Sequence, residues 1–391
     1  MRPKDLFKFP YSIYCFSMFF NSGFLLSVFT LFFISKGLSM TQIALLDSVW
    51  ALTELVFNVP FGIFSDKIGH KSTMAIAIGL QSMTMFLMAI ANGLLWFLVL
   101  FVLWGISSAM ARGPMEALVY ENSLALAQEY KVIRAKLDLF SSSALVVGTI
   151  TGPLLFQISP GWPWVACGLS LLLALVFLWP LPEPSKDRRK FSLGNLGQTL
   201  KDPGILWACL YFGLLFSMAM CFVDLIEQPW LLLIGVPMAF LGVVIAISRF
   251  LPGTVLYFQD KHRLLDHDAL IYGLGPFIWA TVLYSFMTLK GFMVLPLYFA
   301  FFLVRDFNNV LYDNHIQTRL KDDVRASAYS FVGLVISLVY GVMSVVIGHL
   351  IDLYDIGTGL SALVGLSIVL GLIGLLYGLW DKRKIFNIKD R

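Results

Sequence analysis

Charged residues are scarce in this chain. Asp, Glu, Lys and Arg make up only 13% of its 391 residues, against about 25% in ordinary soluble domains. Hydrophobic residues make up 58%, and the mean hydropathy is +0.81. This composition excludes a soluble globular domain and indicates an integral membrane protein. The formal net charge of +4 follows from the basic loops described below and requires no nucleic-acid partner.

Chemistry-bearing motifs are equally scarce. The four cysteines, Cys15, Cys167, Cys209 and Cys221, lie in apolar segments without metal-ligand spacing, so we expect buried packing roles and no metal. A nucleotide-binding loop and a nucleophile, base and acid trio are both missing. The first apolar run has no small-residue cleavage site after it and is predicted to remain as a helix. We therefore expect neither an enzyme nor an ATP-driven pump, and no cofactor.

Long apolar runs recur along the whole chain. Each is about 20 residues long, enough to cross a hydrocarbon core about 30 Å thick. We predict an all-α polytopic protein with twelve transmembrane helices, at 11–34, 42–64, 73–91, 94–115, 137–158, 162–181, 204–226, 237–258, 268–288, 291–312, 326–349 and 358–380. A polar segment rich in Pro and basic residues, with a short surface helix predicted at 193–200, interrupts them. The predicted organisation is a six-helix bundle at 1–181, a cytoplasmic linker at 182–203, and a six-helix bundle with a tail at 204–391.

Lys and Arg residues sort by side when these spans alternate. Of 28, 23 fall in the terminal segments and in the alternate loops that share their face. The opposite face carries only Lys36 and Lys290, and Arg112, Arg249 and Arg305 fall inside spans. Basic loops remain on the cytoplasmic side. We expect a multi-pass protein of the plasma (inner) membrane with both termini in the cytoplasm.

A short pattern repeats in the two halves. Arg112 is followed by Tyr-Glu-Asn at 120–122, and Arg305 is followed by Tyr-Asp-Asn at 312–314. Each pattern closes the fourth span of its half, as expected for two halves with a common plan. Chance similarity between short polar loops is the alternative.

The loop between the second and third spans has a compact motif of Gly, Asp and basic residues. Gly62, Asp66, Lys67, Gly69 and Lys71 follow the spacing Gly, three residues, Asp, Lys, one residue, Gly, one residue, Lys. With its topology, the chain resembles the major facilitator superfamily, in particular twelve-helix bacterial drug:proton antiporters. Two basic residues usually follow the second glycine in that family, and His70 is the one departure here. The resemblance implies two pseudo-symmetric six-helix bundles that work by alternating access, in a monomer.

The resemblance also implies a conformational latch at this loop. Asp66 would approach the positive start of the helix near Ala326, and Lys67 or Lys71 would approach Glu121. These contacts would break when the transporter opens inward. The alternative is a solvated turn that carries ordinary cytoplasmic charges.

Small residues follow one face of the fifth span. Ala144, Gly148 and Gly152 recur every four residues, and Pro153 follows. This is similar to the helix-five pattern of antiporters in the same family, although Ala144 replaces a glycine. Small residues at this spacing let another helix pack closely, and Pro153 permits a bend. Ordinary helix packing is the alternative reading.

Ionisable residues inside the spans are the proton-coupling candidates. Asp47 and Glu54 are seven residues apart on one helix face, and Arg112 and Glu116 are one turn apart. A carboxylate that changes partner during transport binds and releases a proton. A fixed ion pair, a polar gate, or an anion-binding role for Arg112 are the alternatives.

Other polar or soft residues in the spans are candidates for the substrate cavity. They are Asn21, Met218, Asp224, Arg249 and Arg305. Met-rich and aromatic walls suit hydrophobic ligands of varied shape, but lipid-facing helices are also rich in Phe. Carboxylates and arginines occur together, so the sequence does not define a substrate charge.

We predict a secondary active transporter that couples proton entry to efflux of small amphipathic compounds. Its partners would be protons, the lipid bilayer and a small-molecule substrate, and a proton gradient would supply the energy. Uptake or facilitated diffusion of a polar nutrient is the first alternative. A lipid flippase and a receptor without transport are the others.

Overall fold

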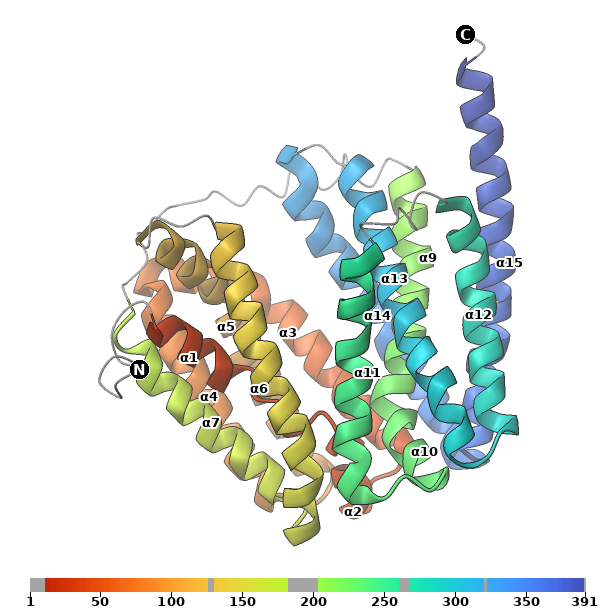
Figure 1. Cartoon of the computed structure of the whole chain (residues 1–391). Helices are drawn as coiled ribbons and strands as arrows, with labels where there is room; N and C mark the ends of the chain where they lie inside the picture. The colour runs from red at the N-terminus through yellow and green to blue at the C-terminus, as the bar shows by residue number, and fades with distance from the viewer. Residues whose placement is uncertain (1–10, 126–129, 182–202, 260–267, 320–321, 390–391) are drawn as a thin grey trace. The chain divides into compact units, whose positions relative to one another are not determined.

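The described part of the chain is helical and divides into two compact units. The computed structural model describes residues 11–125, 130–181, 203–259, 268–319 and 322–389, and every regular element in these ranges is helical (Figure 1). Eight of the helices found there are long and apolar enough to cross a membrane, and four shorter apolar stretches accompany them. The predicted all-α polytopic fold is confirmed. Most of the predicted linker, including the surface helix at 193–200, lies outside the described residues.

The first compact unit, unit 1, contains Met1–Lys190 and Pro237–Ala246. Its helices are α1 (Tyr11–Phe20), α2 (Phe29–Ser35), α3 (Met40–Ile68), α4 (His70–Ile90), α5 (Leu94–Ala125), α6 (Tyr130–Ile158) and α7 (Trp162–Leu178). Helix α5 packs against α3 and α4, while α7 packs against α1 and α4. A cluster of buried rings anchors α2, with Phe32 5.1 Å and Phe33 5.8 Å from Trp164 between ring centroids. This dense aromatic packing holds the short α2 in place.

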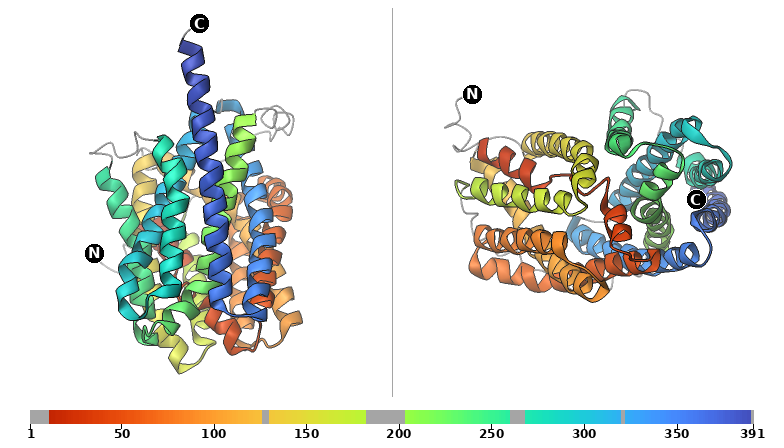
Figure 2. Two further views of the ribbon diagram at one scale, coloured as in Figure 1. Left: turned by 90° about the vertical axis from the view of Figure 1, so that its right-hand side faces the viewer. Right: turned by 90° about the horizontal axis from the view of Figure 1, so that it is seen from below.

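The second compact unit, unit 2, contains Phe191–Val236 and Ile247–Arg391. Its described elements are α9 (Pro203–Cys221), a π-helix (Phe222–Ile226), α10 (Glu227–Leu233), the second part of α11 (Met238–Gln259), α12 (Asp268–Thr288), a 3₁₀ turn (Gly291–Val294), α13 (Leu295–Arg319), α14 (Asp322–Leu353) and α15 (Ile356–Lys389). Helix α15 lies along α12 and continues past it (Figure 2), and α14 packs against α9. The first part of α11 belongs to unit 1.

The first predicted span is not one helix. The prediction of a continuous helix at 11–34 is wrong, because α1 ends at Phe20 and α2 begins only at Phe29. Asn21, Ser22 and Gly23 favour a break, since Asn and Ser bond to nearby backbone and Gly has low helix propensity. The hydroxyl of Ser170 donates to the carbonyl of Phe19 at 2.8 Å and satisfies one acceptor that the break frees.

The predicted loop between the second and third spans is a single residue. Helix α3 continues through Gly62 and Asp66 to Ile68, and α4 begins at His70. Gly69 between them has φ 110°, in the region that favours glycine because side chains on other residues clash there. The prediction that the second span ends at 64 and the third begins at 73 is therefore wrong, since Gly69 alone separates the two helices.

Candidate functional site

One ion pair joins α3 and α5 in unit 1. The guanidinium of Arg112 contacts the carboxylate of Glu54, whose side chain is 10% exposed, whereas that of Arg112 is 63% exposed. Asp47 is also buried on α3, seven residues before Glu54. The sequence singled out Glu54 and Arg112 on different spans as proton-coupling candidates, and the structure brings the two into contact.

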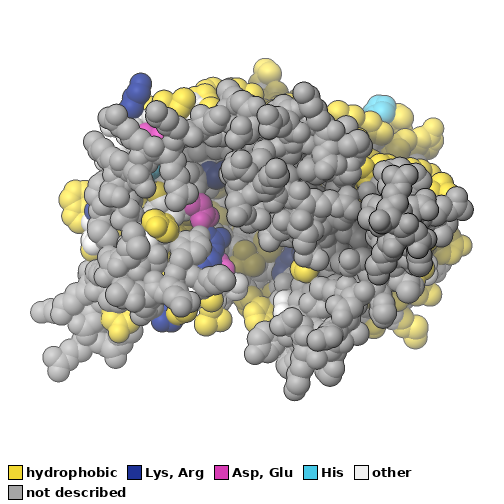
Figure 3. All heavy atoms as spheres, turned by 90° about the horizontal axis from the view of Figure 1, so that it is seen from above, with side chains coloured by type: hydrophobic (Ala, Val, Ile, Leu, Met, Phe, Trp, Pro, Cys, Tyr) yellow, Lys and Arg dark blue, Asp and Glu magenta, His cyan; other side chains and the backbone are white. Residues whose placement is uncertain are grey.

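Glu116 belongs to a different pair. Its carboxylate contacts Nη1 of Arg134 on α6 at 3.0 Å, and Arg134 also reaches Asp138 at 3.3 Å. The predicted partnership of Glu116 with Arg112 is not the one found, because each reaches a residue of another helix. All three side chains of the Arg134 group are well exposed. Figure 3 shows acidic and basic side chains close together among apolar ones in the view from above.

The predicted cavity residue Asn21 bonds within unit 1. Its Nδ2 donates to the carbonyl of Ser17 at 2.9 Å and to Oγ of Ser141 at 3.3 Å. The hydroxyls of Ser17 and Ser141 lie 2.5 Å apart. These bonds tie the end of α1 to α6 beside the break in the first span.

The glycines of α6 lie against the non-helical backbone between α1 and α2. A Cβ on Gly148 would lie 2.6 Å from the backbone nitrogen of Gly23, and one on Gly152 would collide with the carbonyl oxygen of Phe24. Pro153 lies inside α6, as predicted. The predicted close packing of this helix face is present, and its partner is non-helical backbone.

The predicted latch residues lie at the turn between α3 and α4. Asp66 and Lys67 are exposed, and Gly69 forms the turn. Nζ of Lys71 donates to the carbonyls of Trp179 and Leu181 at 2.5 Å and 2.7 Å, so it caps the end of α7. The side chain of Glu121, the predicted partner, lies outside the described residues. The role of these residues as a latch stays a prediction.

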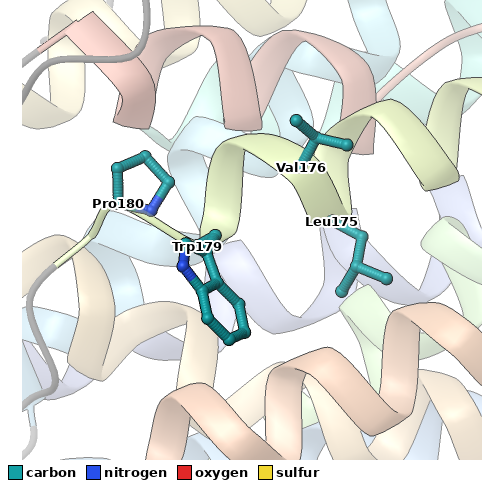
Figure 4. Close-up of a pocket in the computed structure, with 4 residues that line it drawn as sticks. All are labelled: Leu175, Val176, Trp179 and Pro180. Carbon is teal, nitrogen blue, oxygen red and sulfur yellow. The ribbon is translucent and has the colours of Figure 1, made fainter.

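A cavity of about 510 Å³ lies close to this cap. Its walls are Leu175, Val176, Trp179 and Pro180, at the end of α7 (Figure 4). None of these side chains carries a charge, and the ionic networks do not line it. It is an apolar depression on the helix surface rather than a candidate for binding a polar substrate.

A buried ionic network occupies unit 2. Nη2 of Arg249 on α11 contacts Oε2 of Glu227 at 2.6 Å, and the side chains are 11% and 0% exposed. The hydroxyl of Tyr298 on α13 donates to Oε1 of Glu227 and lies 3.1 Å from Oγ of Ser248. Both carboxylate oxygens of Glu227 therefore have a partner. Such an arrangement is needed for a charge that is removed from water.

Asp224 lies one turn before Glu227 along the chain. It falls in the π-helix, and its Oδ2 accepts a hydrogen bond of 2.8 Å from Tyr340 of α14. A π-helix inserts a residue into a helix and is frequent at functional sites. Asp224, a predicted cavity residue, is thus close in sequence to the buried ion pair but bonds to another helix.

Two arginines contact one ring. Phe302 of α13 has the guanidinium carbon of Arg249 4.2 Å and that of Arg305 4.9 Å from its ring centroid. Nε of Arg305 also donates to Oδ1 of Asp306 at 2.7 Å. The structure therefore brings the predicted residues Arg249 and Arg305 together around Phe302, where cation–π attraction offsets part of their desolvation.

Met218 has a packing role instead. Its side chain is 1% exposed, and its Sδ accepts a hydrogen bond from Ser367 at 2.9 Å. Sequence reasoning missed Tyr298, Tyr340 and the π-helix as parts of this site. The available signal was a tyrosine hydroxyl inside an apolar run, which needs a partner when buried. The partner itself depends on helix packing.

Comparisons with known proteins agree with this fold. Two curated relatives from Bacillus subtilis (strain 168) match part of the chain. The uncharacterized MFS-type transporter YxaM is 22% identical over 152 residues, and the hexuronate transporter is 28% identical over 148 residues. These matches cover 39% and 36% of this chain, and 37% and 33% of the relatives. The chain thus matches about a third of the length of each relative.

Solved structures match nearly the whole chain. The nucleoside transporter NupG superposes with a TM-score of 0.79 at 16% identity, covering 93% of this chain and 97% of that one. Tetrameric PepTSo2 gives a TM-score of 0.70 at 13% identity, covering 97% of this chain and 98% of that one. These likenesses show the fold alone. The family model described as Major Facilitator Superfamily matches residues 11–337, and the chain belongs to that family of membrane transporters.

Proposed function

We propose that this transporter is proton-coupled and carries a small polar organic solute. The observation that supports it best is the buried network of Glu227, Arg249 and Tyr298. A charged group inside a membrane-spanning bundle is costly, and such residues commonly serve ion or substrate pathways. Apolar side chains of the same volume would hold the helices together without that cost. Retention of a full ion pair therefore points to transport chemistry.

The balance of charge supports proton binding in unit 2. Among the described residues of this cluster, Asp224, Glu227 and Asp306 are the acids, and Arg249 and Arg305 are the bases. Three carboxylates near two guanidiniums leave one excess negative charge when all are ionised. A single bound proton neutralises it. Release of that proton would change the partners that hold α10, α11 and α13 together.

We propose the same role for Glu54 in unit 1. Its partner Arg112 is mostly exposed, whereas Glu54 is nearly buried. Arg112 is therefore free to leave the pair at little cost, and Glu54 would then take up a proton. Asp47 on the same buried face would assist this step.

Efflux of amphipathic compounds by antiport is the second candidate. The Gly148 and Gly152 pattern of α6 favours it through the resemblance, although both glycines also serve close packing against residues 23 and 24. NupG and the hexuronate transporter carry polar solutes by name, which favours the first candidate. We place the protein in the plasma membrane as a monomer, with both termini cytoplasmic.

Proteoliposomes with an internal pH dye test the proposal. We expect at least one of nucleosides, sugars, sugar acids or short peptides to drive proton movement, and Glu227→Gln to abolish it. The double variant Glu227→Gln/Arg249→Met removes both charges of this ion pair and controls for misfolding. Asp138→Asn removes an exposed ion pair and should have no effect. Proton movement with amphipathic dyes alone would favour the second candidate, and unaltered coupling in Glu227→Gln would contradict the role of the network.

A further inference from the structure

Two acids of the ionic network in unit 2 contact partners of different kinds. The carboxylate of Glu227 contacts the guanidinium of Arg249 and accepts a hydrogen bond from Tyr298. The carboxylate of Asp224 accepts a hydrogen bond of 2.8 Å from the hydroxyl of Tyr340 on α14. The side chain of Glu227 is 0% exposed, whereas Asp224 is half-buried. One acid is therefore fully buried against a charged partner, and the other is more accessible and contacts a neutral hydroxyl.

The π-helix turns these two acids away from each other. Asp224 lies within it, and Glu227 follows it directly. Residues three apart share one face of an α-helix, where two carboxylates would repel each other. A π-helix has hydrogen bonds between residues five apart and so has more residues per turn. The angle between the two side chains therefore widens, and the carboxylate of Asp224 contacts α14 while that of Glu227 contacts α11 and α13.

The titratable and charged groups around Asp224 come from four other helices. They are Glu227 of α10, Arg249 of α11, Arg305 of α13 and Tyr340 of α14. Helix α9 and residues 356–376 of α15 also pack against the π-helix, and neither segment has a charged side chain. Nη2 of Arg249 lies 2.6 Å from the carboxylate of Glu227. Nε of Arg305 lies 2.7 Å from that of Asp306. Asp224 is thus the third carboxylate beside two ion pairs.

Proton binding keeps the hydrogen bond between Asp224 and Tyr340. A hydroxyl both donates and accepts, so Tyr340 donates to the carboxylate and accepts from the protonated carboxyl. A proton on Glu227 would instead leave the buried guanidinium of Arg249 against a neutral group, which is costly. Of the three acids in the cluster, Asp224 is the one whose protonation leaves both ion pairs intact.

We propose that Asp224 is the residue of unit 2 that binds the coupled proton, and that Tyr340 is a positioning residue that bonds to it in both protonation states. The inference rests on the proposed function, because it assigns the proton of that transporter to one side chain. The proton comes from water and returns to water, and no other bond to hydrogen is broken. With the proton bound, the cluster of three acids and two arginines is neutral. Glu227 and Arg249 stay ionised throughout.

Infrared difference spectroscopy of the purified full-length protein tests this assignment without a solute. A carboxylic acid and a carboxylate absorb at different frequencies, so lowering the pH should produce the band of protonated acids. We expect Asp224→Asn to lack one component of that band. Asp138→Asn, which removes an exposed acid, should keep this component. Tyr340→Phe should keep it at a shifted frequency, because the hydrogen bond to the carboxyl is lost. The melting temperature of Asp224→Asn should change little, since its amide oxygen still accepts from Tyr340.

Variants of the neighbouring ion pair make the test sharper. Glu227→Gln leaves two acids beside two arginines, so Asp224 should stay ionised and the component should be lost at the pH at which the wild type shows it. Glu227→Gln/Arg249→Met leaves Asp224 and Asp306 beside Arg305, and the component should return. The assignment is overturned if Asp224→Asn has the same band as the wild type. It is also overturned if the double variant does not recover the component, because that result is expected when Glu227 carries the proton.

Proteoliposomes separate this inference from the proposed function. The solutes are uridine, glucose, glucuronate and dialanine, and those that move protons with the wild type are used for the variants. We expect Asp224→Asn to lose proton movement but to keep exchange of labelled solute, because its amide mimics the protonated acid and exchange requires no proton release. Asp224→Glu should restore proton movement.

The outcomes distinguish the two proposals. If Asp224→Asn moves protons as the wild type does, the assignment fails and the proposed function stands. Loss of exchange together with a large fall in melting temperature would make Asp224 structural and would also overturn the assignment. If no solute moves protons with the wild type while the infrared component depends on Asp224, the coupling proposal fails and the proton site stands.

Discussion

Glu227 and Arg249 hold a full ion pair away from water. Their side chains are 0% and 11% exposed, so each has lost its hydration. The hydroxyl of Tyr298 and the ring of Phe302 provide the remaining contacts. The net stabilisation from such a pair is small, but either partner alone would be a buried, uncompensated charge.

Replacing Glu227 by Gln should therefore destabilise the protein by about 3–5 kcal/mol. The amide keeps the shape but leaves the guanidinium of Arg249 without the carboxylate that contacts it. The double variant Glu227→Gln/Arg249→Met should recover most of this loss. Thermal unfolding of the single and double variants in detergent measures both effects. Equal melting temperatures for the wild type and Glu227→Gln would show that the ion pair does not form.

Asp355 provides a pH-dependent contact outside the membrane-spanning segments. It precedes α15, and its Oδ1 accepts hydrogen bonds from the backbone nitrogen and the hydroxyl of Thr358 at 2.7 Å and 2.9 Å. These bonds favour the charged form and lower the pKa of Asp355 below its usual value of 3.8. The side chain caps the first turn of the helix.

Asp355→Ala should lower the melting temperature at neutral pH and have less effect in acid. A carboxyl whose pKa is depressed on folding stabilises above its unfolded pKa, and this contribution is lost as the pH falls through the folded pKa. The pH range in which this stabilisation is lost lies below about pH 4. Melting curves at pH 7 and at the lowest pH the protein tolerates test this. A difference that grows in acid would contradict the assigned sign.

At the scale of elements, the break between α1 and α2 and the glycines of α6 explain one another. Residues 23 and 24 leave the helix and lie against Gly148 and Gly152. The hydroxyl of Ser27 donates to the carbonyl of Thr149 at 2.8 Å and fixes the contact. The periodicity of small residues showed that something packs there, but not that the partner is an unwound segment.

Gly152→Ala should destabilise unit 1 by about 1–3 kcal/mol, because the new methyl group collides with the carbonyl oxygen of Phe24. Gly113→Ala on α5 is the matched control. Nothing lies within 4 Å of its added Cβ, so a gain of about 0.5–1 kcal/mol from better helix propensity is expected. Thermal unfolding compares the two variants. Similar effects from both would mean that α6 and residues 23–24 are not in close contact.

At the scale of the molecule, the asymmetry of Lys and Arg predicts the orientation in the membrane. We expect Lys290→Cys and Lys36→Cys to react with an impermeant maleimide on intact cells. Lys67→Cys should react only after permeabilisation, because basic loops stay in the cytoplasm. The background replaces the four native cysteines by Ala. Its melting temperature serves as the control. Labelling of Lys67→Cys on intact cells would invert the assigned topology.

Much of the helical layout was readable from the sequence, since a span must be about 20 apolar residues long wherever it crosses lipid. The residues at which the helices end were harder to predict. Helix α3 continues to Ile68 and α5 to Ala125, beyond the predicted 64 and 115. Polar residues can extend a helix past the membrane, where hydropathy gives no signal.

For the candidate site too, the sequence predicted some features and not others. Arg249, Arg305 and Glu54 could be singled out because ionisable residues are rare inside apolar spans. Their partners could not. Tyr298 is 71 residues from Glu227, and no local pattern links them.

The amino-acid sequence alone determined that this protein lies in a membrane, that it is helical, and which ionisable residues fall inside the apolar spans. The reason is that the cost of exposing polar groups to hydrocarbon acts on each segment separately. The tertiary structure alone decided which charges meet, that the first span unwinds against α6, and that Asp224 and Glu227 bond to different helices. Those outcomes depend on contacts between helices distant in sequence, and such contacts are set by packing and hydrogen-bond geometry rather than by hydropathy.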